Sequence, residues 1–128
     1  MEADISGSQR KVVMMRVRPT RPAHGHTGIA LKKGRSLPFV VSRGWSAPAG
    51  VYREQWFLVD PATREVLLES TAQERAIWGL QGLTELADEV TQPLELRAGT
   101  YLLVFSLGGL MGGEFEVEAS EAPAQEAA

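Results

Sequence analysis

Short apolar runs separated by glycine- and proline-rich turns recur along most of this chain. Runs such as KVVMMRVR, LPFVVSR, REQWFLV and TYLLVFSL have the length of single strands, and the turn sequence DPATRE separates two of them. A chain of 128 residues is also long enough to bury one hydrophobic core. We therefore predict a single all-β domain.

The runs predict roughly seven strands, or eight if a short one lies in the Pro- and Gly-rich connection after the first. The expected strands are Lys11–Arg18, Gly28–Leu31, Leu37–Arg43, Arg53–Val59, Glu65–Glu69, Pro93–Arg97, Tyr101–Leu107 and Glu114–Ala119. We expect residues 11–119 to form the domain. The small, polar segments 1–10 and 120–128 are expected to be disordered tails.

The segment Thr71–Val90 does not fit the strand pattern. Thr71 and Glu74 have the spacing of a helix capping box. Apolar residues then follow at helical spacing: Ala76, Leu80, Leu83, Ala87 and Val90. We predict a short helical insertion near residues 71–90, weakened by Gly79 and Gly82.

The sequence Leu96-x-x-Gly99-x-Tyr101 directly precedes an apolar strand. It resembles the tyrosine corner of immunoglobulin and fibronectin type III domains, in which the tyrosine hydroxyl returns to upstream backbone. The resemblance implies an antiparallel β-sandwich with Trp56 in its core, with a jelly roll as the alternative. The chain departs from antibody domains because it has no cysteine for an inter-sheet disulfide. An earlier phrase, Ala49-Gly50-Val51-Tyr52, lacks the leucine, so we do not interpret the two as a repeat.

Alternation along the strands predicts which side chains face out. If Trp56 and Tyr101 point inward, the opposite face of the sheet carries Phe57, Val59, Leu102 and Val104, bordered by Glu114, Glu116 and Glu118. An apolar outer face needs cover, from the 71–90 segment, from the Thr20–Lys33 connection, or from a partner. We predict a non-catalytic interaction or structural module that forms a homo-oligomer or docks on a protein partner through this face.

Charge is distributed unevenly along the chain. Residues 1–50 contain nine Lys and Arg residues against Glu2 and Asp4, a net charge of +7, and the remainder has a net charge of −10. Pairing between the two halves is the simpler interpretation. The alternative is a polyanion site, with nucleic acid as the partner, formed by Arg16, Arg18, Arg21, Lys32, Lys33 and Arg35. This basic segment lacks the interleaved aromatics that stack on bases.

Two weaker candidate sites lie in loops. Trp45 and Tyr52 flank an expected loop, where aromatic side chains are suited to bind a carbohydrate. His24 and His26 have a spacing that suits a shared metal ion, but no third histidine exists to complete a cupin-like set. No nucleophile motif or phosphate-binding loop is present, so we predict neither enzyme activity nor a cofactor.

Composition adds limits on location. No apolar run approaches the roughly eighteen residues of a membrane span, and the start MEADISGSQRKVV has no secretory h-region. We therefore expect a cytoplasmic protein without membrane contact. Cysteine and asparagine are both absent and arginine outnumbers lysine, a tendency of thermophile proteins that a GC-rich genome also produces.

Overall fold

Every regular element in the described part of the chain is a β-strand. The computed structural model describes residues 9–21 and 26–122, and these ranges contain ten strands and no helix. The strands are β1 (Lys11–Pro19), β2 (Ile29–Lys32), β3 (Arg35–Ser36), β4 (Phe39–Ser46), β5 (Gly50–Val59), β6 (Val66–Glu69), β7 (Gln73–Ile77), β8 (Thr84–Val90), β9 (Gly99–Leu107) and β10 (Leu110–Glu121). The predicted all-β class is confirmed. Within the same ranges, no helix is long and apolar enough to cross a membrane.

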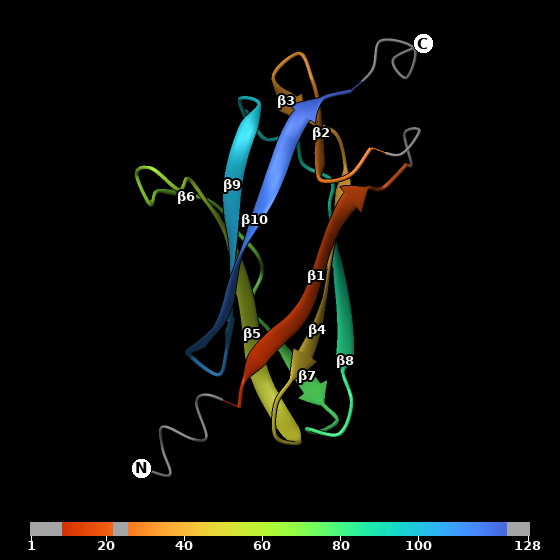
Figure 1. Cartoon of the computed structure of the whole chain (residues 1–128), viewed down its shortest axis with the longest axis vertical. Helices are drawn as coiled ribbons and strands as arrows, with labels where there is room; N and C mark the ends of the chain where they lie inside the picture. The colour runs from red at the N-terminus through yellow and green to blue at the C-terminus, as the bar shows by residue number, and fades with distance from the viewer. Residues whose placement is uncertain (1–8, 22–25, 123–128) are drawn as a thin grey trace.

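The strands form two sheets. The small sheet contains three antiparallel strands in the order β1-β4-β8. The large sheet has the order β3-β2-β10-β9-β5-β6, with β7 also paired to β5, and its β2–β10 pair is parallel. Figure 1 shows β1, β4 and β8 along one side of the molecule and β9, β10 and β5 along the other. The large sheet curls like half a barrel, so the architecture is not a plain sandwich of two flat layers.

The predicted helical insertion is wrong, because residues 71–90 form β7 and β8. Along β8 the side chains of Thr84, Leu86, Asp88 and Val90 are more buried than those of the residues between them, which is the period of two expected of a strand. The helical spacing expected for this segment includes Leu80 and Leu83. These two residues lie in the connection between β7 and β8, where they are 48% and 41% exposed. Gly79 and Gly82 lie in this same connection.

The expected strand at Pro93–Arg97 is also absent. The segment forms a single bridge, between Glu95 and Arg35. Hydrogen bonds nevertheless attach it to the β2–β3 region: the Leu94 N–H donates to the Ser36 hydroxyl at 2.9 Å, and the Leu96 N–H donates to the Gly34 carbonyl at 3.0 Å. β10 continues past the expected end at Ala119 to Glu121, where it pairs with β2.

The hydrophobic core lies between the sheets. The small sheet contributes Val41 and Trp45, and the large sheet contributes Leu103 and Phe105, all fully buried. As predicted, β5, β9 and β10 are neighbours in one sheet. The inward positions of Trp56 and Tyr101 are confirmed by their burial in this core, together with those that alternation then implies for Leu58, Leu103, Phe105 and Leu107.

Two tyrosines make the same local contact at the starts of β5 and β9. The Tyr101 hydroxyl donates a 2.7 Å hydrogen bond to the carbonyl of Arg97, which is the contact that the tyrosine-corner resemblance implies. The Tyr52 hydroxyl donates a 2.7 Å bond to the carbonyl of Pro48, again four residues upstream. The two Ala-Gly-x-Tyr phrases therefore form equivalent corners, although their flanking sequences differ.

Candidate interaction surfaces

The outer face of the large sheet contains the four apolar residues that alternation predicted. Phe57 pairs with Val104, and Val59 pairs with Leu102, across the β5–β9 ladder. None of the four belongs to the core cluster between the sheets. Phe57 and Val104 are half-buried, whereas Val59 and Leu102 are 5% and 9% exposed. We call this set the outer face.

A shallow hollow of about 280 Å³ lies on the outer face. Phe57, Val59 and Val104 line it from the sheet, and Val66 and Arg64 close it from the β5–β6 hairpin. The Arg64 guanidinium reaches Glu114 of β10 at 3.3 Å, so the hairpin turn and β10 are connected across the sheet. Of the described residues, neither the 71–90 segment nor residues 20–21 and 26–33 line this hollow. Exposed ion pairs of this kind contribute about 0–1 kcal/mol, so this one is easily opened.

The predicted glutamate border is present along β10. Glu114, Glu116 and Glu118 are all exposed and alternate with the more buried Phe115 and Val117. Glu118 accepts a hydrogen bond from the Thr100 hydroxyl on β9. The border is therefore a row of carboxylates on one flank of the outer face.

The basic residues divide between two places. Arg16 and Arg18 are exposed on β1 of the small sheet, and Arg21 is exposed just after it. Lys32, Lys33 and Arg35 lie at the β2–β3 turn. There Lys33 and Arg35 line a hollow of about 450 Å³ together with Asp60 and Glu95. The turn is therefore a surface of mixed charge.

The two loop aromatics do not form a common exposed site. Trp45 lies within β4 rather than in a loop, and its side chain is fully buried. Tyr52 is half-buried, and the Arg10 guanidinium stacks 4.7 Å from its ring centroid. Because Trp45 has no exposed surface, it is not available to stack on a sugar.

The histidine pair is only partly described. His24 lies outside the described residues, and the Nε2 of His26 is 3.3 Å from the Ser120 hydroxyl. Among residues 9–21 and 26–122, no group of three or more metal-binding side chains gathers in one place.

A buried ionic network lies between the sheets, and the sequence analysis did not identify it. Arg43 of β4 is fully buried and donates to both carboxylate oxygens of Glu54 on β5, at 2.9 and 2.5 Å. Its guanidinium also donates to Asp88 of β8 at 3.0 Å and to the Val41 carbonyl at 3.1 Å. The Trp45 indole donates to Glu54 at 2.6 Å. Paired and hydrogen-bonded in this way, two charges can be tolerated in a protein interior.

Asp88 is the exposed end of this network. It accepts hydrogen bonds from the Trp56 indole at 2.8 Å and from Arg75 of β7 at 2.8 Å. Burial raises the pKa of Asp88, but the Trp56 hydrogen bond and the positive charges of Arg43 and Arg75 outweigh it. The pKa of Asp88 therefore lies below its ordinary value of 3.8.

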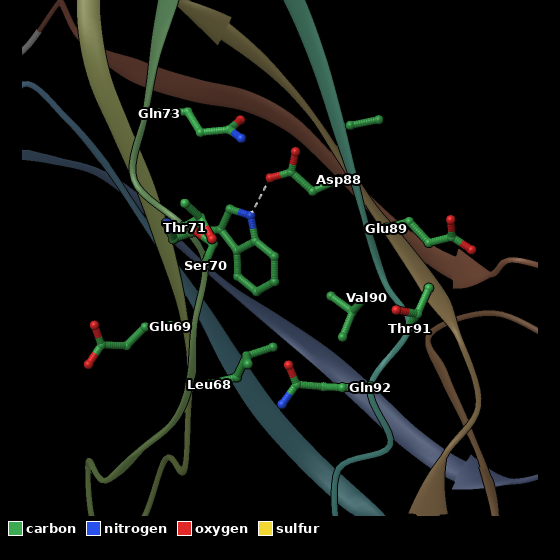
Figure 2. Close-up of a pocket in the computed structure, with 12 residues that line it drawn as sticks. Leu68, Glu69, Ser70, Thr71, Gln73, Asp88, Glu89, Val90, Thr91 and Gln92 are labelled. Atoms are coloured by element: carbon green, nitrogen blue, oxygen red, sulfur yellow. Dashed lines mark hydrogen bonds between the residues drawn. The ribbon is translucent and has the colours of Figure 1, made fainter.

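An open groove of about 390 Å³ lies above Asp88. Figure 2 shows one wall running from Leu68 to Gln73 along the β6–β7 connection, and the other running from Asp88 to Gln92 along and beyond β8. Trp56 lies between the walls, held by its bond to Asp88 and by the bond from its own N–H to the Ser70 hydroxyl at 2.8 Å. We call this hollow the edge groove.

The alternation of inward and outward residues in β4 and β5 is a sequence signal for this buried network. Arg43 has the same parity in β4 as the buried Val41 and Trp45. Glu54 has the same parity in β5 as Trp56 and Leu58. A charged residue at an inward position of a strand indicates a buried pair, because an unpaired charge is too costly there. The sequence contains no comparable signal for the edge groove, because the apolar spacing of residues 71–90 predicts a helix rather than β7 and β8.

The lowered pKa predicts how stability depends on pH. The native state favours the ionised form of Asp88. The stability that ionised Asp88 gives to the fold is therefore complete above the ordinary pKa of 3.8, and it is lost as the pH falls through the lower pKa of the native state. Asp88→Asn is expected to be less stable than the original chain at about pH 7, with the gap closing at about pH 2. Urea unfolding of both proteins across this range measures the gap, and a pH-independent gap would contradict the assignment.

The fold and these surfaces define an all-β domain with an apolar outer face and an open sheet edge. No protein-family model matches the chain, and no curated protein matches it. Among solved structures it is similar to the Pseudomonas fluorescens alkylpurine DNA glycosylase AlkC bound to DNA containing an abasic site analog. The TM-score is 0.57 and the identity 10% over 92% of this chain, which spans 33% of the other. A likeness at this identity concerns the fold alone.

Proposed function

We propose that this protein is a non-catalytic interaction module that self-associates through the outer face. The hollow formed by Phe57, Val59 and Val104 supports this most, because it is an apolar depression on a sheet face bordered by charged side chains. An apolar centre with a polar rim is the usual anatomy of a protein interface. Val66 at its margin is 46% exposed and adds apolar area.

Charge supports a second copy as the partner. The carboxylate row of β10 lies on one side of β9, and Arg53 and Arg64 lie on the other side, on β5 and its following turn. A two-fold axis parallel to β9 would place β10 of one copy over β5 of the other. Arg64 of each copy then lies beside the glutamate row of its partner and can exchange Glu114 of its own chain for a partner carboxylate, which matches the requirement that an isologous interface be self-complementary.

The mass of the protein in solution tests this proposal. By light scattering we expect a dimer that survives high salt, because an apolar contact is not screened. Val104→Glu is expected to give a folded monomer, since Val104 faces outward. Leu103→Glu, one residue earlier and fully buried, is expected to unfold the chain. A monomer at low and high salt, or unfolding by both substitutions, would overturn the proposal.

A polyanion-binding function, with DNA as the partner, is the second candidate. The structural neighbour was solved with DNA bound, and Arg16 and Arg18 are exposed on β1. The mixed charge of the β2–β3 turn makes it the weaker candidate. Adding duplex DNA to the same mass measurement separates the two, because phosphate contacts weaken steeply with salt.

The finer assignment of the fold is also a proposal. We infer an immunoglobulin-type sandwich rather than a jelly roll, in which the small sheet packs on the β10-β9-β5 part of the curled large sheet. The Tyr101 corner and a core drawn from both sheets support it.

A further inference from the structure

The small sheet has one open edge. β8 pairs with β4 along one side, and no strand within residues 9–21 and 26–122 pairs with its other side. The opposite edge strand, β1, is not open in the same way, because its Val17 carbonyl accepts a 2.8 Å hydrogen bond from Gly28 beside β2. β8 therefore presents unpaired backbone groups, which can act as a template for another strand.

β8 lacks two of the features that block such pairing, and the charged residues that it carries are all acidic. It contains no proline, and its register with β4 runs from Val90 to Thr84 without a bulge. Proline residues and bulges are common means by which native proteins prevent strand addition at an edge. The backbone of β8 is thus regular and suited to accept a further strand.

The edge groove lies directly beside this open edge. One of its walls is Ala87–Val90 of β8 with Thr91 and Gln92, so a segment lying in the groove is adjacent to the β8 backbone (Figure 2). On the opposite wall the backbone of Ser70 is already paired, because its N–H donates to the Trp56 carbonyl and its carbonyl accepts from the Gln55 side chain. An occupant that pairs with the β8 backbone therefore cannot also pair with Ser70 at the centre of the other wall.

The charge of the groove selects for a basic occupant. Arg43 and Arg75 already neutralise Asp88 at the floor. Glu69 on one wall and Glu89 on the other remain exposed, and no lysine or arginine lines the groove. A segment that alternates basic and apolar residues fits both requirements, because alternate side chains of a strand point to opposite faces. Its apolar side chains would face Trp56 and Leu68.

We propose that the open edge of β8 and the edge groove bind an extended, basic segment of a partner protein, which adds to the small sheet as a fourth strand. This mode of recognition obtains its affinity from main-chain hydrogen bonds and its specificity from alternate side chains. It uses a surface separate from the outer face and does not depend on self-association.

A synthetic peptide of about nine residues that alternates arginine and valine is the probe. Trp78 is 81% exposed, so the titration uses a Trp78→Phe background in which the emission comes from Trp45 and Trp56. We expect saturable fluorescence change together with slowed hydrogen exchange of the backbone amides in residues 87–92. The same peptide with glutamate in place of arginine is expected not to bind.

Three protein variants and one modified peptide separate strand addition from simple charge attraction. Glu69→Lys and Glu89→Lys are each expected to weaken binding about tenfold. Glu121→Lys makes the same charge change at the end of β10, outside the groove lining and the outer face, and is expected to have little effect. A peptide that is N-methylated at alternate residues keeps its charge but loses main-chain donors, so it is expected not to bind. Equal binding by the N-methylated peptide, equal loss in Glu121→Lys, or no protection of residues 87–92 would overturn the proposal.

Discussion

Replacing Arg43 with methionine is expected to destabilise the fold by about 3–5 kcal/mol, the cost of removing one partner of a buried ion pair. The guanidinium is fully buried and donates to Glu54, Asp88 and the Val41 carbonyl. Without it, the carboxylate of Glu54 remains buried with only the Arg75 Nε, at 3.5 Å, as a cationic neighbour. Because domains of this size are stable by about 5–15 kcal/mol, this single change approaches the whole margin.

The double variant Arg43→Met/Glu54→Gln tests the cause of that loss. Glutamine removes the charge at position 54 but keeps a side-chain oxygen to accept from the Trp45 indole. We expect urea unfolding, followed by tryptophan fluorescence, to show that the double variant is more stable than Arg43→Met alone. A double variant that loses the sum of the two single effects would show that packing, rather than an unpaired buried charge, explains the cost.

Replacing Gly112 with alanine is expected to cost about 3 kcal/mol, at the upper end of the usual penalty for an added methyl group in a packed core. Gly112 lies at the register shift in β10, between Met111 and Gly113. A Cβ at this position would overlap the six-membered ring of Trp45. The indole cannot easily move away, because it is fully buried and hydrogen-bonded to Glu54. Thermal unfolding of the purified variant measures the loss.

Gly82→Ala is the matched control for this substitution. A Cβ at Gly82 meets no heavy atom within 4 Å, so the variant is expected to be as stable as the original chain. If Gly112→Ala is equally neutral, the close packing of Trp45 on β10 is not present in solution. The two results together separate a steric cost from the general effect of replacing glycine in this fold.

These two predictions concern residues whose importance could not be recognised from local sequence. Gly112 belongs to the run GGLMGG, which has the composition of a hairpin tip. Only Gly108 and Gly109 form the turn, whereas Gly112 lies within β10 against a tryptophan that is far away in sequence. Glycine composition indicates that a backbone bends or approaches another group closely, but it does not indicate which.

The candidate surfaces were predictable to different degrees. The outer positions of Phe57 and Val104 followed from the parity of Trp56 and Tyr101 within their own strands. The edge groove was not predictable, because the helical spacing of Ala76, Leu80, Leu83, Ala87 and Val90 predicts a helix where β8 lies. Helical and strand periodicities can both be satisfied by a short mixed segment, and long-range pairing decides between them. Here the pairing of β8 with β4 decided in favour of the strand.

By itself, the sequence determined the all-β class, the position of most strands and the inward side of β5 and β9, because a strand's period of two is a property of neighbouring residues. Only the tertiary structure decided that Arg43, Glu54, Arg75 and Asp88 form one network, since these residues come from β4, β5, β7 and β8. It also decided that β8 is left with an open edge. Both outcomes depend on which distant strands pair, and that choice is made by the burial of the whole core rather than by any local pattern.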